Sequence, residues 1–180
     1  MTRLHLKEAA AHGEIEAPAS GSRAPGKTRA LELGVLNGHV GYFVRRFQVW
    51  IFHDFVRTLA PFDIRPAQYS VLVVIDANPG LSQADLANTL GIARSRLVRL
   101  IDGLEGRGLT RRLPSPNDRR SHALFLTHDG QRKLKRIKAL AAAHEARVEA
   151  SLGAASRNQM LSALKAFAIQ GKRRHQRTPI

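Results

Sequence analysis

The chain has 180 residues, with 29 lysines and arginines against 14 aspartates and glutamates, and its formal net charge is +15. This balance favours a polyanionic partner, either nucleic acid or an acidic membrane surface. The absence of cysteine excludes disulfides, thiolate metal sites and cysteine redox sensing. Because the sequence shows no signal-peptide core and no run of 18 apolar residues, we expect a one-domain, soluble cytoplasmic protein.

The two ends of the chain differ in composition from its middle. Residues 1–33 combine glycine and proline with alanine, serine and scattered charge, which predicts a flexible basic arm. Residues 172–180 form a basic tail. The arm could touch DNA, but a solvated segment is the simpler explanation. Residues 34–171 then form the folded domain.

The first part of this domain has the pattern of two helices. Apolar residues recur at three- and four-residue steps from Leu36 to Leu59, which predicts one long amphipathic helix. Pro61 is expected to stop it, and Pro66 suits the first turn of a second helix that is too apolar to be exposed. The residues Asn78-Pro79-Gly80 end that second helix.

A helix-turn-helix pattern follows. Ser82 and Asp85 have capping-box spacing at the start of a short helix, and Gly91 turns the chain at its end. The sequence ARSRLVRLIDGLEGRGL then predicts another helix directly after this turn. Two short helices joined by a tight glycine turn are typical of DNA-binding domains.

A helical wheel divides the second of these helices into two faces. The apolar side gathers Leu97, Val98, Leu100, Ile101 and Leu104, while Ser95, Arg96 and Arg99 share the opposite side and Arg94 lies at the first turn. A solvated face usually mixes glutamate and lysine, whereas the bulky groups here are arginines. We therefore expect Arg94, Ser95, Arg96 and Arg99 to contact DNA.

The stretch PSPNDRRSHALFLT places a turn between two strand-like segments, LTRRL and SHALFLT. A hairpin directly after a recognition helix is a wing. Arg119 and Arg120 are expected at its tip, where guanidinium groups can enter a narrow minor groove. Asp118 is expected to pair with a neighbouring arginine and to fix the loop.

Two further helical patterns complete the domain, within residues 129–170. Together with the first long helix over 36–60, they carry more apolar surface than a small winged module over 65–127 can cover. A symmetric dimer would bury this surface. The predicted fold is mainly α with a small β-wing: a winged helix-turn-helix plus a helical dimerisation region.

The residues from Leu81 to Gly130 resemble the MarR family of dimeric winged-helix transcription regulators, and the similarity extends over about residues 36 to 170. The specific elements are LxxxLExRGL, here from Leu100 to Leu109, followed by an Asp-Arg-Arg wing and by Leu126, Thr127 and Gly130. Ser115 departs from the pattern, since many members have aspartate there. The resemblance implies a homodimer on a pseudo-palindromic operator, released from DNA when a small molecule binds.

Aromatic and cationic residues gather in the first helix and the segment after it. Aromatic walls with a few cations suit an aromatic carboxylate or a larger anionic derivative. This region resembles the branch of the family that controls aromatic-acid breakdown, in which some members sense a thioester such as p-coumaroyl-CoA. Aromatics at helical spacing can equally belong to the core. The candidate ligand-binding residues are Tyr42, Arg45, Arg46, Trp50, His53 and Tyr69.

The expected function is a ligand-responsive repressor of aromatic-acid catabolism, and the alternative is a sequence-indifferent, nucleoid-like DNA-binding protein. We expect that the protein is not an enzyme, since the chain has no Gly-rich phosphate loop, nucleophile motif or paired-carboxylate signature. No cofactor or metal site is expected, because the histidines have no compact ligand spacing. His144 lies on the apolar face of its helix, where a core or interface histidine is the simpler interpretation.

Overall fold

The computed structural model describes residues 31–114 and 122–175, with side chains described as far as residue 168. The chain divides into two units, residues 1–38 and 39–180. In the first unit a 3-10 helix, η1, spans Gly34–Gly38. The predicted arm at residues 1–30, the wing tip and the end of the tail lie outside the described residues.

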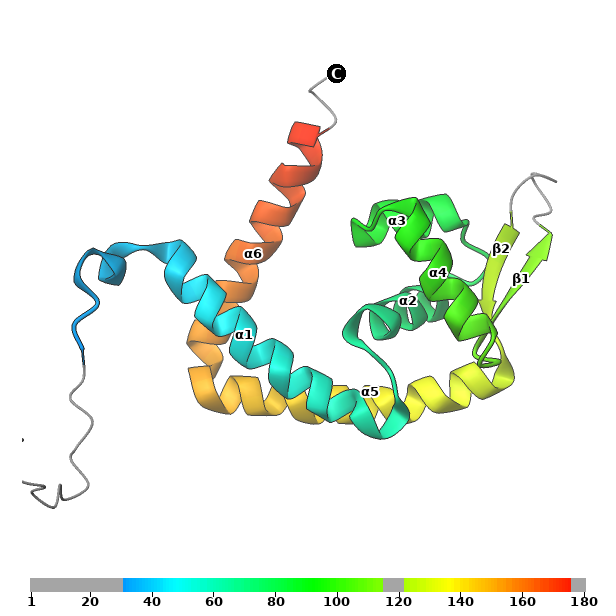
Figure 1. The fold of residues 1–180 in the computed structure, drawn as a ribbon, viewed down its shortest axis with the longest axis horizontal. Coiled ribbons are helices and arrows are strands. Elements are labelled where there is room, and N and C mark those ends of the chain that lie inside the picture. The colour runs from blue at the N-terminus through cyan, green and yellow to red at the C-terminus, as the bar shows by residue number, and fades with distance from the viewer. Residues whose placement is uncertain (1–30, 115–121, 176–180) are drawn as a thin grey trace, which may run out of the picture. The chain divides into compact units, whose positions relative to one another are not determined.

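The second unit is mostly helical, with one two-stranded antiparallel sheet, and this confirms the predicted fold class (Figure 1). Its elements in chain order are α1 (Val40–Leu59), η2 (Ala60–Phe62), α2 (Pro66–Ala77), α3 (Gln83–Leu90), α4 (Arg94–Glu105), β1 (Thr110–Pro114), β2 (His122–Leu126), α5 (His128–Leu152) and α6 (Ala154–His175).

The first long helix is shorter than predicted at its N-terminal end. It begins at Val40 rather than Leu36, and the preceding Gly34 has a positive φ of 55°. Glycine is a weak helix former, so Gly34 and Gly38 leave only a short 3-10 turn before α1. At its C-terminal end α1 stops at Leu59, as predicted from Pro61. The chain continues as η2 with Pro61 in its first turn and stops at Asp63, whose φ is 50°.

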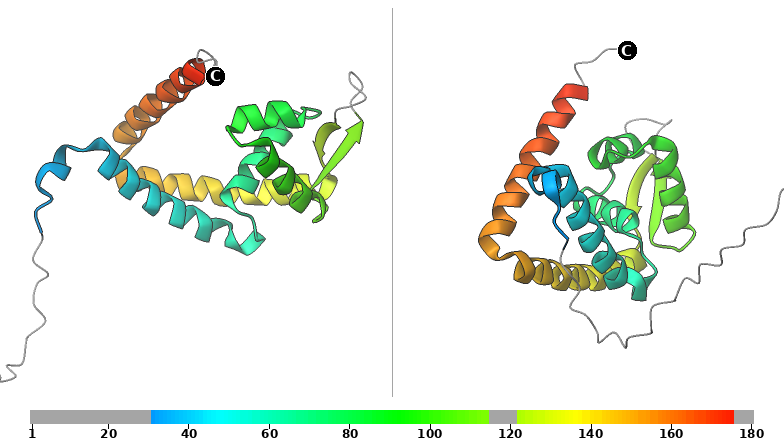
Figure 2. Two further views of the ribbon diagram at one scale, coloured as in Figure 1. Left: turned by 45° about the horizontal axis from the view of Figure 1, so that its top comes forward. Right: turned by 60° about the vertical axis from the view of Figure 1, so that its left-hand side comes forward.

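The core lies where α2, α4, β2 and α5 meet. Leu72 and Ile75 of α2 are fully buried together with Leu104 of α4, Leu124 of β2 and Ile137 of α5. The long helix α1 packs along α5, as the views in Figures 1 and 2 show. A tight set of apolar contacts therefore fixes the helix-turn-helix and the hairpin on one end of α5.

The junction between the hairpin and α5 explains the Leu-Thr-x-x-Gly motif. The hydroxyl of Thr127 accepts the amide hydrogen of Gly130 at 2.9 Å and donates to the carbonyl of Gly108 at 2.6 Å. A Cβ atom on Gly130 would lie 2.0 Å from the carbonyl oxygen of Leu109. Glycine is thus required for α5 to approach the start of β1 this closely.

The hairpin is as predicted, with Thr110 opposite Leu126 and Pro114 opposite His122. The structure adds a backbone connection that was not predicted. The amide of Gly80 donates to the carbonyl of Leu124 at 2.8 Å, and the amide of Leu124 donates to the carbonyl of Leu81 at 3.0 Å. The segment before α3 therefore holds β2 from its second edge.

A set of large apolar side chains on α1 and α6 stays exposed in the single chain. Phe167 is 73% exposed and Val40 is 76% exposed. Surface of this kind marks an interaction site when it is contiguous. No helix among the described residues is long and apolar enough to cross a membrane. The exposed large apolar residues of these two helices are Val40, Phe43, Val44, Val49, Trp50, Phe52, Val56, Leu161, Leu164 and Phe167.

Candidate DNA-binding surface and ligand region

The helix-turn-helix is built from α3 and α4. Ser82 caps α3, since its hydroxyl accepts the amide hydrogen of Asp85 at 3.1 Å and donates to the Asp85 carboxylate at 2.8 Å. The second half of the predicted capping box, from Asp85 back to the Ser82 amide, is replaced by this side-chain bond. Gly91 then turns the chain with a φ of 63°, and α4 begins at Arg94.

The four candidate DNA contacts on α4 are all exposed: Arg94, Ser95, Arg96 and Arg99. The side chains of Leu97, Ile101 and Leu104 on the opposite face are buried, as the wheel predicted. None of the three arginines forms an ion pair with a residue in the described ranges. Their charges are therefore available to a partner, while their role in DNA binding stays a prediction.

The acidic residues of α4 are paired, and sequence reasoning missed their partner. The Arg112 guanidinium on β1 lies 2.6 Å from the carboxylate of Asp102 and also pairs with Glu105. The backbone amide of Arg112 donates to Glu105 at 3.0 Å as well. Arg112 thus partly neutralises both carboxylates and fixes the hairpin to α4.

One residue of α4 differs from its predicted position. The wheel grouped Val98 with the apolar side, yet Val98 is 41% exposed. Its Cα–Cβ direction lies about 90° from the centre of the stripe formed by Leu97, Ile101 and Leu104, at the border of the exposed face.

The structure describes the base of the predicted wing but not its tip. Arg119, Arg120 and Asp118 lie in residues 115–121, outside the described ranges. The described strands β1 and β2 lead toward and away from that segment, and β1 packs beside α4 (Figure 1). The roles of the three residues stay predictions. Arg111 near the base is exposed, with its guanidinium 5.9 Å from the Phe125 ring centre.

The six candidate ligand residues fall into three places rather than one. Tyr42 and Arg46 contact each other at 3.2 Å near the start of α1, with Arg45 exposed beside them. Trp50 and His53 line a cavity of about 420 Å³ further along the same helix.

Tyr69 packs elsewhere, against the Phe55 ring at 5.5 Å, and burial raises the pKa of its phenol. Residues 42 and 53 of one straight helix are about 17 Å apart along its axis. The single chain therefore does not assemble the six residues into one pocket.

Asp54 connects α1 to α5 beneath this region. Its carboxylate accepts hydrogen bonds from the Nδ1 atom of His144 at 2.7 Å and from Arg147 at 2.8 Å, and it pairs with Arg57 at 3.1 Å. The hydrogen bonds from His144 and Arg147 hold the pKa of Asp54 well below its usual range. His144 is 2% exposed, stacks near Phe55 at 4.8 Å, and is thus a hydrogen-bonded core residue.

The described residues contain no group of three or more histidines or carboxylates that could hold a metal ion. The described residues do form an arginine-rich helix face on α4. The opposite face of α4 packs on the core, and Arg112 of the hairpin pairs with its acidic residues. A helix-turn-helix followed directly by an antiparallel hairpin defines a winged helix-turn-helix protein.

Comparisons with known proteins agree with this class. A family model described as MarR family matches residues 62–121. A putative transcriptional regulatory protein for the hcr operon of Thauera aromatica is 36% identical over 133 residues, which cover 73% of this chain and 80% of that protein. The chain belongs to the MarR family.

Two solved structures of the transcriptional repressor CouR are also similar to this chain. In one, CouR is bound to a 23-mer DNA duplex; the identity is 46%, the TM-score is 0.74, and the match covers 77% of this chain and 99% of that one. In the other, CouR is bound to p-coumaroyl-CoA, with 44% identity, a TM-score of 0.70 and coverage of 77% and 98%.

Proposed function

We propose that this protein is a DNA-binding transcriptional repressor that acts as a homodimer on a pseudo-palindromic operator. The observation that carries the proposal is the exposed face of α4, where three arginines have no ion-pair partner in the described part of the chain. Arginine forms bidentate hydrogen bonds with guanine in the major groove. The likeness to CouR bound to a DNA duplex supports this use of α4.

The proposed effector is an aromatic acid or its coenzyme A thioester, such as p-coumaroyl-CoA. Two observations support it: the 44% identity to CouR in its complex with p-coumaroyl-CoA, and the aromatic and cationic residues of α1. Trp50 and His53 already line a cavity in the single chain. Because the six candidate residues lie in three places, a complete pocket would require a second chain or a rearrangement of α1.

The dimer is proposed to form through residues 36–60 and 129–170, leaving residues 65–127 to contact DNA. The exposed apolar residues of α1 and α6 supply the surface for such an interface. The domain boundaries, a cytoplasmic location and the absence of catalytic activity belong to the same proposal. Relatives that are transcription regulators support all three.

A gel-shift assay on the DNA upstream of the protein's own gene tests the function. We expect a specific complex that survives an excess of unrelated duplex and that p-coumaroyl-CoA releases. Free p-coumarate and coenzyme A without an acyl group are the matched controls. Equal binding to every duplex would favour the nucleoid-like alternative, and a complex that neither acid nor thioester releases would refute the effector.

A further inference from the structure

Val98 is an exposed apolar side chain on the helix that carries the candidate DNA contacts. It is 41% exposed, whereas Leu97, Ile101 and Leu104 of the same helix are at most 1% exposed. The three buried side chains form one stripe along α4, and Val98 points about 90° away from the centre of that stripe. Packing in the core therefore does not account for an apolar residue at this position.

Helix stability and the proposed dimer do not account for Val98 either. Branched side chains such as valine lose rotamer freedom in a helix and form helices less well than alanine, leucine or lysine. The exposed apolar residues proposed for the dimer lie on α1 and α6, whereas α4 packs chiefly on α2, α3 and β1. A partner that meets the arginine face of α4 is therefore the candidate to cover Val98.

The neighbours of Val98 on α4 show which partner this is. Residues four apart lie on the same side of a helix, so Val98 has Arg94 one turn before it and Asp102 one turn after it. All three residues are exposed. Asp102 pairs with Arg112 of β1, so this side of α4 lies beside the hairpin. The methyl groups of Val98 thus lie between the first arginine of α4 and the base of the wing, where the proposed function requires the duplex.

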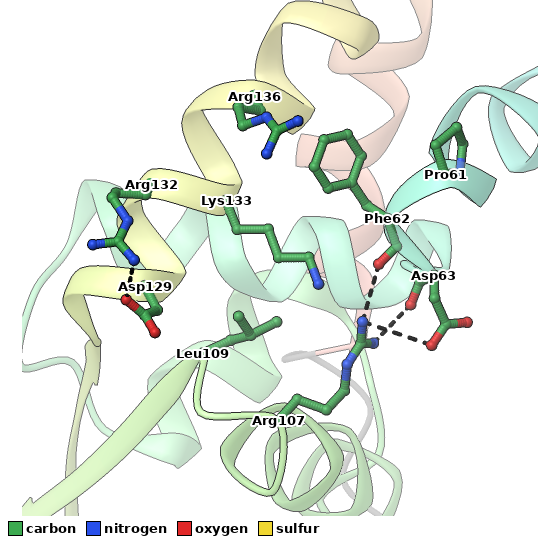
Figure 3. Close-up of a pocket in the computed structure, with 9 residues that line it drawn as sticks. All are labelled: Pro61, Phe62, Asp63, Arg107, Leu109, Asp129, Arg132, Lys133 and Arg136. Atoms are coloured by element: carbon green, nitrogen blue, oxygen red, sulfur yellow. Dashed lines mark hydrogen bonds and ion pairs between the residues drawn. The ribbon is translucent and has the colours of Figure 1, made fainter.

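The C-terminal end of α4 is held in place on two sides. Arg107, two residues after the end of α4, donates to the carbonyl oxygens of Phe62 at 3.0 Å and of Asp63 at 2.7 Å (Figure 3). Arg112 of β1 pairs with Glu105 in the last turn of the helix. These contacts fix α4 to the rest of the domain. A van der Waals contact with a base requires such a rigid support, because its energy falls steeply with distance.

A valine that faces the major groove selects one kind of base edge. The C5-methyl group of thymine is the apolar group there, whereas the other groups are hydrogen-bond donors or acceptors. Valine forms no side-chain hydrogen bond, so a donor or acceptor buried against it would lose its bond to water. In a helix valine also has one strongly preferred χ1 rotamer, and its methyl groups therefore present a fixed surface. The chemistry of Val98 matches thymine.

We propose that Val98 determines sequence specificity by contacting the methyl group of a thymine in each half-site of the operator. The inference rests on the proposed binding of operator DNA through α4. It adds a second kind of base to the recognition, since the arginines of α4 are suited to guanine. In a homodimer on a pseudo-palindromic operator the contact is made twice, so the two thymines lie at symmetry-related positions.

Replacement of thymine by deoxyuracil tests the contact, because uracil lacks only the methyl group and keeps the hydrogen-bonding pattern of thymine. Fluorescence anisotropy measures the affinity of the full chain for the operator and for duplexes in which one symmetric pair of thymines at a time is replaced. We expect one pair whose replacement weakens wild-type binding about tenfold, since one buried methyl contact is lost in each half-site. The same replacement should weaken the binding of Val98→Ala less than about twofold.

Leu113→Ala is the matched control, because Leu113 is an apolar residue of β1 with nearly the same exposure, 39%. This variant should keep the wild-type loss on the uracil duplex. The proposal is overturned if no pair of thymines affects wild-type binding, or if Val98→Ala loses as much affinity as the wild type. Either result leaves the proposed function intact while the operator is still preferred over a scrambled duplex. Equal binding to the operator and the scrambled duplex would overturn the proposed function, and this inference with it.

Discussion

Asp54 links α1 and α5 through one half-buried carboxylate. His144 and Arg147 of α5 both donate to it, and Arg57 of α1 pairs with it on the outside. These bonds stabilise the ionised form, so the pKa of Asp54 is lower in the folded chain than in the unfolded chain. The stabilisation is therefore complete above the unfolded pKa of about 4 and is lost as the pH falls through the folded value.

We expect Asp54→Asn to lower the free energy of unfolding by about 2 kcal/mol at pH 7, because hydrogen bonds to a charged group are lost. The difference from the wild type should shrink as the pH falls below about 4, because the Asp54 carboxylate of the unfolded chain then takes up a proton while that of the folded chain stays ionised. Urea denaturation of the variant and the wild type at pH 7 and pH 3, at one protein concentration, measures the difference in the free energy of unfolding at each pH.

Asp76→Asn is the matched control for Asp54→Asn, since Asp76 pairs with Lys138 of α5 at 2.6 Å in a more exposed position. We expect it to lower stability by less than about 1 kcal/mol. A pH-independent loss in Asp54→Asn, or equal losses in the two variants, would contradict the role given to the Asp54 carboxylate.

Gly130 is the second residue whose identity the structure explains. The space for a Cβ atom is filled by the Leu109 carbonyl, 2.0 Å away. Gly130→Ala should therefore lower the free energy of unfolding by about 1–3 kcal/mol through overpacking. Gly103→Ala on α4 is the control, because nothing lies within 4 Å of its added methyl group. A neutral result for Gly130→Ala in urea denaturation would show that α5 does not approach β1 this closely.

At the scale of elements, ion pairs connect the hairpin to α4. Arg112 is the connection, since it pairs with both Asp102 and Glu105 of α4. Arg112→Gln should expose these carboxylates next to DNA phosphates and lower operator affinity at least about tenfold. Fluorescence anisotropy with a labelled operator measures this loss.

Neutralising the two carboxylates separates their effect from a direct DNA contact of Arg112. The triple variant Arg112→Gln/Asp102→Asn/Glu105→Gln should recover most of the affinity, because no unpaired carboxylate remains on α4. If the triple variant binds no better than Arg112→Gln alone, Arg112 itself contacts the duplex, and masking of the acids does not explain the loss.

The sequence alone predicts those elements whose signal lies within a few neighbouring residues. The turn at Gly91 and the apolar stripe of Leu97, Ile101 and Leu104 predicted α3 and α4 from periodicity and turn chemistry alone. The partner of Asp102 and Glu105 was not predictable in this way. In a strand, Arg111 and Arg112 point to opposite faces, and only the packing of β1 on α4 decides which of them meets the acids.

The candidate ligand residues show a second limit of sequence patterns. Their closeness in sequence placed Tyr42, Trp50 and Tyr69 in one aromatic group, yet Tyr42 and Trp50 lie at different points along α1 and Tyr69 packs on Phe55. Aromatic residues that follow one another in sequence can serve a core, a cavity and an open surface at once. The face that each one uses depends on neighbours that periodicity does not specify.

At the scale of the whole molecule, the exposed apolar residues of α1 and α6 are the basis for the proposed dimer. Leu164→Lys/Phe167→Lys places two charges on this surface, and we expect a shift from dimer to monomer in sedimentation velocity at micromolar concentration. Val98→Lys adds a charge at an exposed apolar position of α4 and should leave the dimer intact. A double variant that sediments as a dimer would exclude this face as the interface.

The most direct test of the central claim, that the arginine face of α4 reads operator DNA, is anisotropy titration of Arg99→Ala. The duplex is the operator identified by the gel shift, and a scrambled duplex of the same composition is compared with it at two salt concentrations. We expect a loss of about 1–3 kcal/mol on the operator and little change on the scrambled duplex, since a base contact is removed. Lys135→Ala, which removes an exposed charge from α5, should bind both duplexes like the wild type. An Arg99→Ala variant that retains the wild-type preference for the operator would contradict the claim.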